Sequence, residues 1–267
     1  MKQSDCPIGI FDSGFGGLTV MSAVCKILPS ENIIYFGDTA HLPYGSKSKE
    51  TVLKFSKDIA DFLISKNIKM LVVACNTASA FALKELRKTL KIEVAGVIEA
   101  GSKKAVLESA NKRIGVIGTQ GAMASGAYKR EIKKICGKAQ VFQQSCPLFV
   151  PIVEEGWTNT KAADEIAAVY LKPLAAKKID VLVLGCTHYP LLKNSIRKNT
   201  EGIKLIDSAL SVALEVKDIL ERKKLKRESA KKPFLRFYAS DDPKKFQTIG
   251  RKFFSSKIKK VEKIVLD

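Results

Sequence analysis

The sequence lacks the features that mark membrane-spanning and secreted proteins. No apolar run reaches roughly 18 residues, the length that a membrane-spanning helix needs, and the first residues, MKQSDCPIGIF, lack the apolar core of a signal peptide. We therefore expect a cytoplasmic protein with no membrane partner. The chain of 267 residues contains six cysteines. Without a secretory signal, these are expected to be free thiols rather than a disulfide framework.

Histidine is also scarce, and this argues against a metal site. Zinc takes three or four nitrogen, sulfur or oxygen ligands. Because the chain has only two histidines, a zinc site would have to combine Cys75, Cys186, His188 and an acidic residue. We regard this as the main rival chemistry for these residues and predict no metal.

Acidic residues are outnumbered by basic ones, which gives a net charge of +19, and the positive excess is concentrated after residue 210. A basic surface can follow nucleic-acid phosphates, so a nucleic-acid-binding module is the alternative from another functional class. However, aromatic residues make up only 7% and do not alternate with the lysines as base-stacking residues would. We therefore favour a solvated surface that also attracts a small anionic substrate.

The first glycine-rich turn lacks the spacing of a dinucleotide-binding motif. The turn DSGFGG follows the apolar run Ile8–Phe11, but the third glycine or alanine would fall at Thr19. The turn still offers backbone N–H groups at the start of a helix, which suit a carboxylate. Asp12, at the end of the run, either caps this helix or takes part in the chemistry. No pyridoxal motif is evident, and we predict no cofactor.

Two segments with the same construction dominate the rest of the sequence. They are KMLVVACNTAS at Lys69–Ser79 and DVLVLGCTHYP at Asp180–Pro190. In each, a short apolar run typical of a buried strand ends in a cysteine followed by polar residues. Ligands of open α/β sheets bind at the carboxyl ends of such strands, so Cys75 and Cys186 are the leading candidate residues.

An internal repeat extends this similarity and predicts the fold. IGIFDSG and IGVIGTQG precede the two cysteine segments by similar distances. We predict an α/β protein with two pseudosymmetric α/β domains, whose mostly parallel sheets face each other across a central cleft. The domains are expected at residues 1–98 plus 208–267 and at residues 99–207, because the first half lacks a closing element that the C-terminal segment could supply. The pattern also predicts helices over 79–90 and 122–136 and strands over 93–99 and 234–239.

Two thiols on opposite sides of a small anion suit a particular reaction. Removing the α-proton of an amino acid and returning a proton to the other face needs two acid/base groups, and a thiol with a pKa of about 8.5 can act near neutrality. The polar groups of Asn76, Thr77 and Thr187 could bind the substrate. A Cys–His dyad for acyl transfer is the alternative. Such a dyad needs the histidine across from the thiol, whereas Cys186 and His188 are two residues apart on one segment, and it leaves Cys75 without a role.

Five motifs in order, DSGFGGLTV, YFGDTAHLPYG, VVACNTASA, CPLFVPIVEEG and LGCTHYPLL, resemble those of the glutamate racemases in the aspartate/glutamate racemase family. These are cofactor-independent enzymes that supply D-glutamate for peptidoglycan. The resemblance implies that Cys75 takes the proton from D-glutamate and Cys186 from L-glutamate, assisted by Asp12, Glu154 and His188. The substrate-binding residues that it implies are Asp12, Ser13, Pro43, Tyr44, Gly45, Asn76, Thr77, Thr187 and His188.

One position departs from the family pattern. Ala122 stands where members commonly have threonine, so this chain lacks a hydroxyl that would be a candidate donor to a substrate carboxylate. An aspartate racemase is the alternative within the same architecture, although the five motifs argue against it. The expected partner is the small-molecule substrate, L- or D-glutamate, and the sequence leaves the oligomeric state open, including a homodimer.

Overall fold

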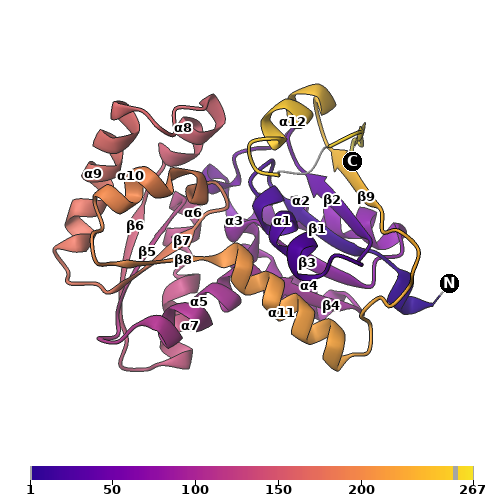
Figure 1. Ribbon diagram of the computed structural model, residues 1–267, viewed down its shortest axis with the longest axis horizontal. Helices are drawn as coiled ribbons and strands as arrows, with labels where there is room; N and C mark the ends of the chain where they lie inside the picture. Colours follow the sequence, from indigo (N-terminus) through magenta and orange to yellow (C-terminus); the bar gives the residue numbers. More distant parts are fainter. Residues whose placement is uncertain (1, 255–257, 267) are drawn as a thin grey trace. The chain divides into compact units, whose positions relative to one another are not determined.

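The computed structural model describes residues 2–254 and 258–266 and divides the chain into two compact units (Figure 1). The first unit comprises Met1–Val97 and Ala209–Asp267, and the second comprises Ile98–Ser208. Each unit contains a parallel sheet with helices packed on it, so the predicted α/β class is confirmed. Over the described ranges, no helix combines the length and the apolar character needed to cross a membrane.

The first unit contains a six-stranded sheet in the order β10-β9-β2-β1-β3-β4, with every neighbouring pair parallel. Its strands are β1 (Ile8–Asp12), β2 (Ile33–Gly37), β3 (Met70–Val73), β4 (Glu93–Gly96), β9 (Leu235–Ala239) and β10 (Val261–Lys263). Its helices are η1 (Gln3–Asp5), α1 (Leu18–Ile27), η2 (Tyr44–Ser46), α2 (Lys49–Ser65), α3 (Asn76–Phe81), α4 (Leu83–Thr89), α11 (Ser208–Arg222) and α12 (Pro243–Gly250). Strands β1, β2 and β3 are buried at every residue, as continuous apolar runs predict.

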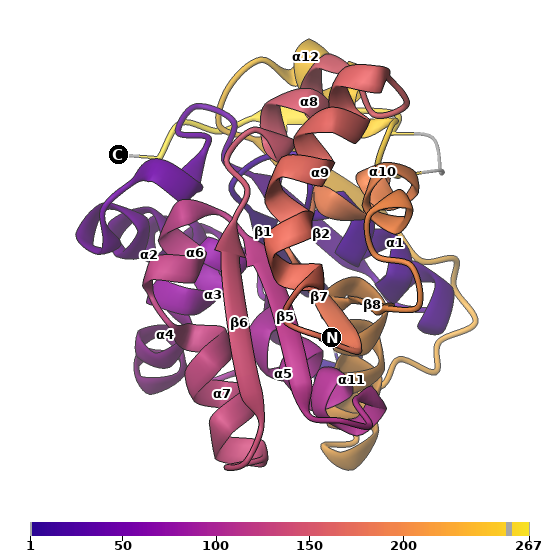
Figure 2. The same ribbon diagram turned by 90° about the vertical axis from the view of Figure 1, so that its left-hand side faces the viewer.

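The second unit contains a four-stranded parallel sheet in the order β6-β5-β7-β8, and Figure 2 shows β5 and β6 side by side. Its strands are β5 (Arg113–Gly118), β6 (Gln140–Ser145), β7 (Val181–Gly185) and β8 (Lys204–Asp207). Its helices are α5 (Val97–Glu108), α6 (Gln120–Ala124), α7 (Ala127–Ile135), α8 (Phe149–Glu155), α9 (Lys161–Ala175), η3 (Tyr189–Leu192) and α10 (Lys193–Lys198).

The same strand topology occurs in both units. The order β2-β1-β3-β4 in the first sheet corresponds to β6-β5-β7-β8 in the second. A packing detail is repeated as well: a Cβ atom added at Gly9 would lie 2.7 Å from Ile68, and one added at Gly115 would lie 2.5 Å from Ile179. Both isoleucines precede the strand that leads to a cysteine, so the repeat read from the sequence is also a repeat in packing.

Three element boundaries differ from those predicted from the sequence. The strand expected over 93–99 ends at Gly96, and α5 begins at the next residue. The helix expected over 79–90 begins earlier and is divided at Ala82 into α3 and α4. The helix expected over 122–136 is divided into α6 and α7 by Gly126, whose φ of 64° lies in the left-handed region that favours glycine.

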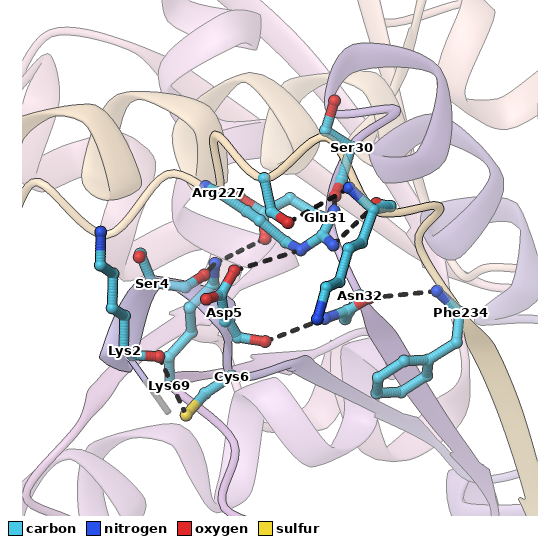
Figure 3. Close-up of polar contacts among 12 residues, drawn as sticks. Lys2, Ser4, Asp5, Cys6, Ser30, Glu31, Asn32, Lys69, Arg227 and Phe234 are labelled. Carbon is cyan, nitrogen blue, oxygen red and sulfur yellow. Dashed lines mark hydrogen bonds and ion pairs between the residues drawn. The ribbon is translucent and has the colours of Figure 1, made fainter.

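A buried polar cluster lies at the amino ends of the strands in the first unit (Figure 3). We call Glu31, Lys69 and Arg227 the Lys69 cluster. The ammonium of Lys69 donates to Glu31 at 2.5 Å and to the carbonyl oxygens of Ser4 at 2.6 Å and Leu225 at 2.8 Å. The backbone N–H of Arg227 donates to the second carboxylate oxygen of Glu31 at 2.8 Å. The cluster therefore joins three segments that are distant in the sequence.

Candidate active site

Both candidate cysteines lie at the carboxyl end of a central strand. Cys75 follows β3 after one residue, and Cys186 follows β7 directly. Their side chains are buried, with 5% of Cys75 and 7% of Cys186 exposed. Because β3 and β7 occupy equivalent places in the two sheets, the repeated topology positions one thiol in each unit.

In the first unit, the turn after β1 brings a carboxylate to the same sheet edge as Cys75. Asp12 ends β1, is fully buried, and accepts a hydrogen bond from the backbone N–H of Gly14 at 3.0 Å. The hydroxyl of Tyr35 donates to the carbonyl oxygen of Gly14 at 2.9 Å and so holds the turn from β2. Burial, with the charges of Asp12 and Cys75, raises the pKa of Tyr35 well above its usual value, which keeps this donor protonated.

Cys75 occupies the N-cap position of helix α3. Its sulfur accepts a hydrogen bond from the backbone N–H of Ala78 at 3.4 Å and lies 3.7 Å from the hydroxyl oxygen of Ser13. The sulfur therefore takes the place that a serine, threonine or aspartate side chain occupies at other helix starts. Asn76 and Thr77 form the first turn of α3 and are both buried.

The loop after β2 carries three more of the residues singled out in the sequence. Pro43 precedes the short helix η2, and Tyr44 and Gly45 lie within it. The hydroxyl of Tyr44 is buried and donates to the carboxylate of Asp38 at 2.5 Å. Burial, followed by the charge of Asp38, raises the pKa of Tyr44 far above its usual value. Tyr44 thus remains a hydrogen-bond donor.

In the second unit, Cys186 lies at one end of a hydrogen-bonded chain. The Nδ1 atom of His188 is 3.9 Å from the sulfur of Cys186 and 3.5 Å from the hydroxyl of Thr187. On the other side of the ring, Nε2 is 3.0 Å from a carboxylate oxygen of Glu154, which helix α8 supplies. The histidine is 5% exposed.

The charge state of His188 follows from these contacts. Burial lowers the pKa of a histidine because it disfavours the charged form. Here the hydrogen bonds to Cys186 and Glu154 outweigh burial and raise the pKa of His188 to about 10. The imidazole ring is therefore positively charged near neutral pH, and this charge lies beside the sulfur of Cys186.

The site residues predicted from the sequence thus fall into two groups. The first unit brings together Asp12, Ser13, Pro43, Tyr44, Gly45, Cys75, Asn76 and Thr77, and the second brings together Glu154, Cys186, Thr187 and His188. The sequence did not indicate the roles of Tyr35 and Asp38, whose hydrogen bonds organise the turn and the loop. Tyr35 has no local signal because it lies inside an apolar strand, whereas Asp38 directly follows that strand within the motif YFGDTAHLPYG.

Ala122 is also placed by the structure. It lies fully buried in the first turn of α6, and its backbone N–H donates to the hydroxyl of Thr119 at 3.2 Å. The hydroxyl of Thr119 therefore caps the helix that follows β5. Within the described part of the chain, no three histidine, cysteine, aspartate or glutamate side chains form a group that could hold a metal ion.

Comparisons with known proteins identify the family. The model of the Asp/Glu/hydantoin racemase family matches residues 17–216. A glutamate racemase of Geobacter metallireducens is 48% identical over 97% of each chain. The solved structure of the Francisella tularensis glutamate racemase in complex with D-glutamate is 39% identical, covers 99% of each chain and has a TM-score of 0.94. A Bacillus anthracis glutamate racemase isoform is 35% identical, with a TM-score of 0.93 over 99% of this chain and 98% of that one. The chain therefore belongs to the Asp/Glu/hydantoin racemase family and, within it, to the glutamate racemases.

Proposed function

We propose that this protein interconverts L- and D-glutamate without a cofactor, with Cys75 and Cys186 as the two acid/base groups. The observation that carries this proposal is the equivalent placement of the two thiols, each at the carboxyl end of the same strand of a repeated sheet. A single catalytic base would leave one of these two positions without a role. The family relationship and the Francisella tularensis structure with D-glutamate support glutamate as the substrate.

In the proposed reaction, the thiolate of Cys186 removes the α-proton of L-glutamate and becomes a thiol. The electron pair left on the α-carbon takes a proton from the thiol of Cys75 on the opposite face, which gives D-glutamate and leaves Cys75 as a thiolate. The reverse reaction exchanges these roles. Proton exchange with water then restores the starting state of both cysteines.

Neighbouring groups have defined tasks in this proposal. The positive ring of His188, held by Glu154, lies beside Cys186 and favours a negative charge on the sulfur. Asp12 assists at the Cys75 side. The substrate carboxylates and ammonium are bound by residues of the two groups. These are Asp12, Ser13, Pro43, Tyr44, Gly45, Asn76 and Thr77 in the first unit and Thr187 and His188 in the second.

The wider setting follows from the same proposal. The two racemase domains are assigned to residues 1–98 with 208–267 and to residues 99–207. Glutamate racemases supply D-glutamate for peptidoglycan, and we propose that this protein has the same role and acts in the cytoplasm. The sequence leaves the oligomeric state open, and analytical ultracentrifugation of the purified protein tests whether it forms a homodimer.

The hydrogen isotope of the product tests the two-thiol mechanism. In deuterated water, early product formed from either enantiomer should carry deuterium at the α-carbon while unreacted substrate stays protiated, because the returned proton comes from the second thiol. Mass spectrometry of the separated enantiomers measures both. Early product that retains the substrate hydrogen would contradict the mechanism, and faster turnover of L-aspartate than of L-glutamate would contradict the assigned substrate.

A further inference from the structure

A buried carboxylate outside the proposed catalytic set organises the loop that carries Tyr44. Asp38 directly follows β2, at the same edge of the sheet as Asp12, and is 2% exposed. Its two oxygens accept hydrogen bonds from the hydroxyl of Tyr44 at 2.5 Å, from the hydroxyl of Ser240 at 2.7 Å and from Nδ1 of His41 at 2.9 Å. Three donors from separate positions therefore converge on one side chain.

Ser240 brings the far end of the sequence into this arrangement. It follows β9, which pairs with β2 in parallel register. Its hydroxyl oxygen accepts the backbone N–H of Ala40 at 2.8 Å while it donates to Asp38. The next residue, Asp241, exchanges two hydrogen bonds with the hydroxyl of Thr39, at 2.6 Å and 2.9 Å. Thr39 and Ala40, the first residues of the loop, are thus hydrogen-bonded to the segment that follows β9.

The geometry at Asp38 requires a carboxylate. An ionised carboxylate accepts through about four lone-pair positions and donates nothing, so it can satisfy three donors together. An asparagine in its place would offer one accepting oxygen and would direct an NH2 group at the remaining donors. Burial of the charge is compensated because every one of the three contacts is a hydrogen bond to it.

We propose that Asp38 and Ser240 are positioning residues for the substrate, acting through the loop of residues 39–46. The proposal rests on the proposed function, since that function makes Tyr44 and Gly45 substrate contacts. Asp38 fixes the hydroxyl of Tyr44, and Ser240 fixes both Asp38 and the backbone of Ala40. Glutamate binding in the first unit therefore depends on a residue of the C-terminal segment that touches no substrate.

Removal of one hydroxyl tests the proposal against a matched control. We expect Ser240→Ala to raise the KM for glutamate about tenfold, since a hydrogen bond to a charged group is lost, with kcat changed by less than about twofold. Ser240→Thr keeps the hydroxyl and should restore most of the affinity. The control is Ser56→Ala, because Ser56 is fully buried in α2 and donates only to the carbonyl oxygen of Val52. This change should leave KM unaltered.

Amide hydrogen exchange supplies a readout that does not depend on activity. Exchange of the Ala40 amide and of the residues up to Ser46 should be faster in Ser240→Ala and Asp38→Asn than in wild type or Ser56→Ala. Equal exchange and equal KM in Ser240→Ala and Ser56→Ala would overturn the proposal. If wild type fails to racemise glutamate, the proposed function is wrong, and the exchange measurement still decides whether Asp38 and Ser240 hold the loop.

Discussion

The six cysteines differ from one another in what surrounds each sulfur. Burial raises the pKa of Cys25 to about 11 and that of Cys146 further, so both thiols stay protonated and act as packing groups. Cys75 instead receives a backbone N–H, and Cys186 lies beside a charged histidine. All six are free thiols in the structure, as the sequence predicts.

The first prediction concerns these two thiols. We expect Cys75→Ala and Cys186→Ala each to lower racemisation by ~10²–10⁴-fold, the usual contribution of a positioned acid or base. Each replacement should act on both directions, because every turnover uses one thiol as base and the other as acid. Enantiomer-specific assays starting from L- and from D-glutamate measure this. Cys25→Ala is the control and should keep wild-type rates, whereas substantial activity in either of the other variants would count against the mechanism.

The second prediction concerns the charge of His188. In an NMR titration, its imidazole ring should stay protonated to about pH 10, and Glu154→Gln should lower its pKa because one of the two hydrogen bonds to a charged partner is lost. An unshifted His188 in Glu154→Gln would show that Glu154 does not hold the charge.

The raised pKa of His188 also makes the free energy of unfolding depend on pH. The folded-state pKa of His188 is raised above its unfolded value of 6.5, so its contribution to the free energy of unfolding is fully present below that pH. The contribution is lost as the pH rises toward about 10. The free energy of unfolding measured with urea should therefore fall more across this interval in wild type than in Glu154→Gln. An equal fall in both proteins would contradict the expectation.

At the level of secondary-structure elements, the start of helix α1 lies close against the end of strand β1. A Cβ atom at Gly17 would lie 2.5 Å from the Cβ of Asp12 and 2.9 Å from the hydroxyl of Tyr35. We expect Gly17→Ala to cost roughly 1–3 kcal/mol of unfolding free energy by overpacking and to lower kcat, because Asp12 must move. Chemical denaturation and steady-state kinetics measure the two effects.

The matched control for this change is Gly137→Ala. A Cβ atom at Gly137 would meet nothing within 4 Å. This variant should therefore fold and turn over like wild type. If Gly17→Ala behaves in the same way, the close approach of Asp12 to the helix start is not needed for either property.

The sequence predicts the elements whose pattern is strong and local. The apolar runs of β3 and β7 and the polar residues after them locate both thiols, because a strand buried on both faces needs a continuous apolar run. The boundary between β4 and α5 is not evident from the sequence, because apolar Val97 and Ile98 fit a buried strand as well as the buried start of a helix. The short strand β10 was missed because its residues are largely exposed and show no alternation.

Contacts between distant residues could not be predicted in this way. The hydrogen bond from Ser240 to Asp38 joins positions more than 200 residues apart, and neither residue has a neighbour that indicates the other. Sequence motifs gave Tyr44 through its family resemblance, and Asp38 lies six residues before it in the same motif. They could not give Ser240 as a partner of Asp38, because that contact depends on the pairing of β9 with β2.

At the scale of the whole molecule, the Lys69 cluster stabilises the first unit. We expect Lys69→Met to cost roughly 3–5 kcal/mol of unfolding free energy, because it leaves the buried charge of Glu31 without its partner. The double variant Lys69→Met with Glu31→Gln should recover much of this loss, since the glutamine oxygen still accepts from Arg227. Urea unfolding measures both, and kcat of the folded protein should stay near wild type because the cluster is at the opposite edge of the sheet from Cys75.

An exposed ion pair provides the control for the Lys69 cluster. Lys161 and Glu165 lie 3.8 Å apart, with side chains 91% and 68% exposed. Lys161→Met should change the free energy of unfolding by no more than about 0.5 kcal/mol, as expected for a solvated pair. A similar cost for Lys161→Met and Lys69→Met would mean that burial of the Lys69 cluster has no energetic effect.

The Lys69 cluster also sets the order in which a nascent chain can mature on the ribosome. Lys69 needs the carbonyl oxygen of Leu225, and β2 needs β9 as its neighbour, so the first unit cannot be completed until translation is almost finished. The second unit is one uninterrupted stretch, Ile98–Ser208, and leaves the ribosome ahead of those residues. Domains usually fold in the order of their synthesis. Here the second unit, although its residues are translated after the N-terminal ones, is the first that can form a complete core. The N-terminal residues complete their core only with the C-terminal segment.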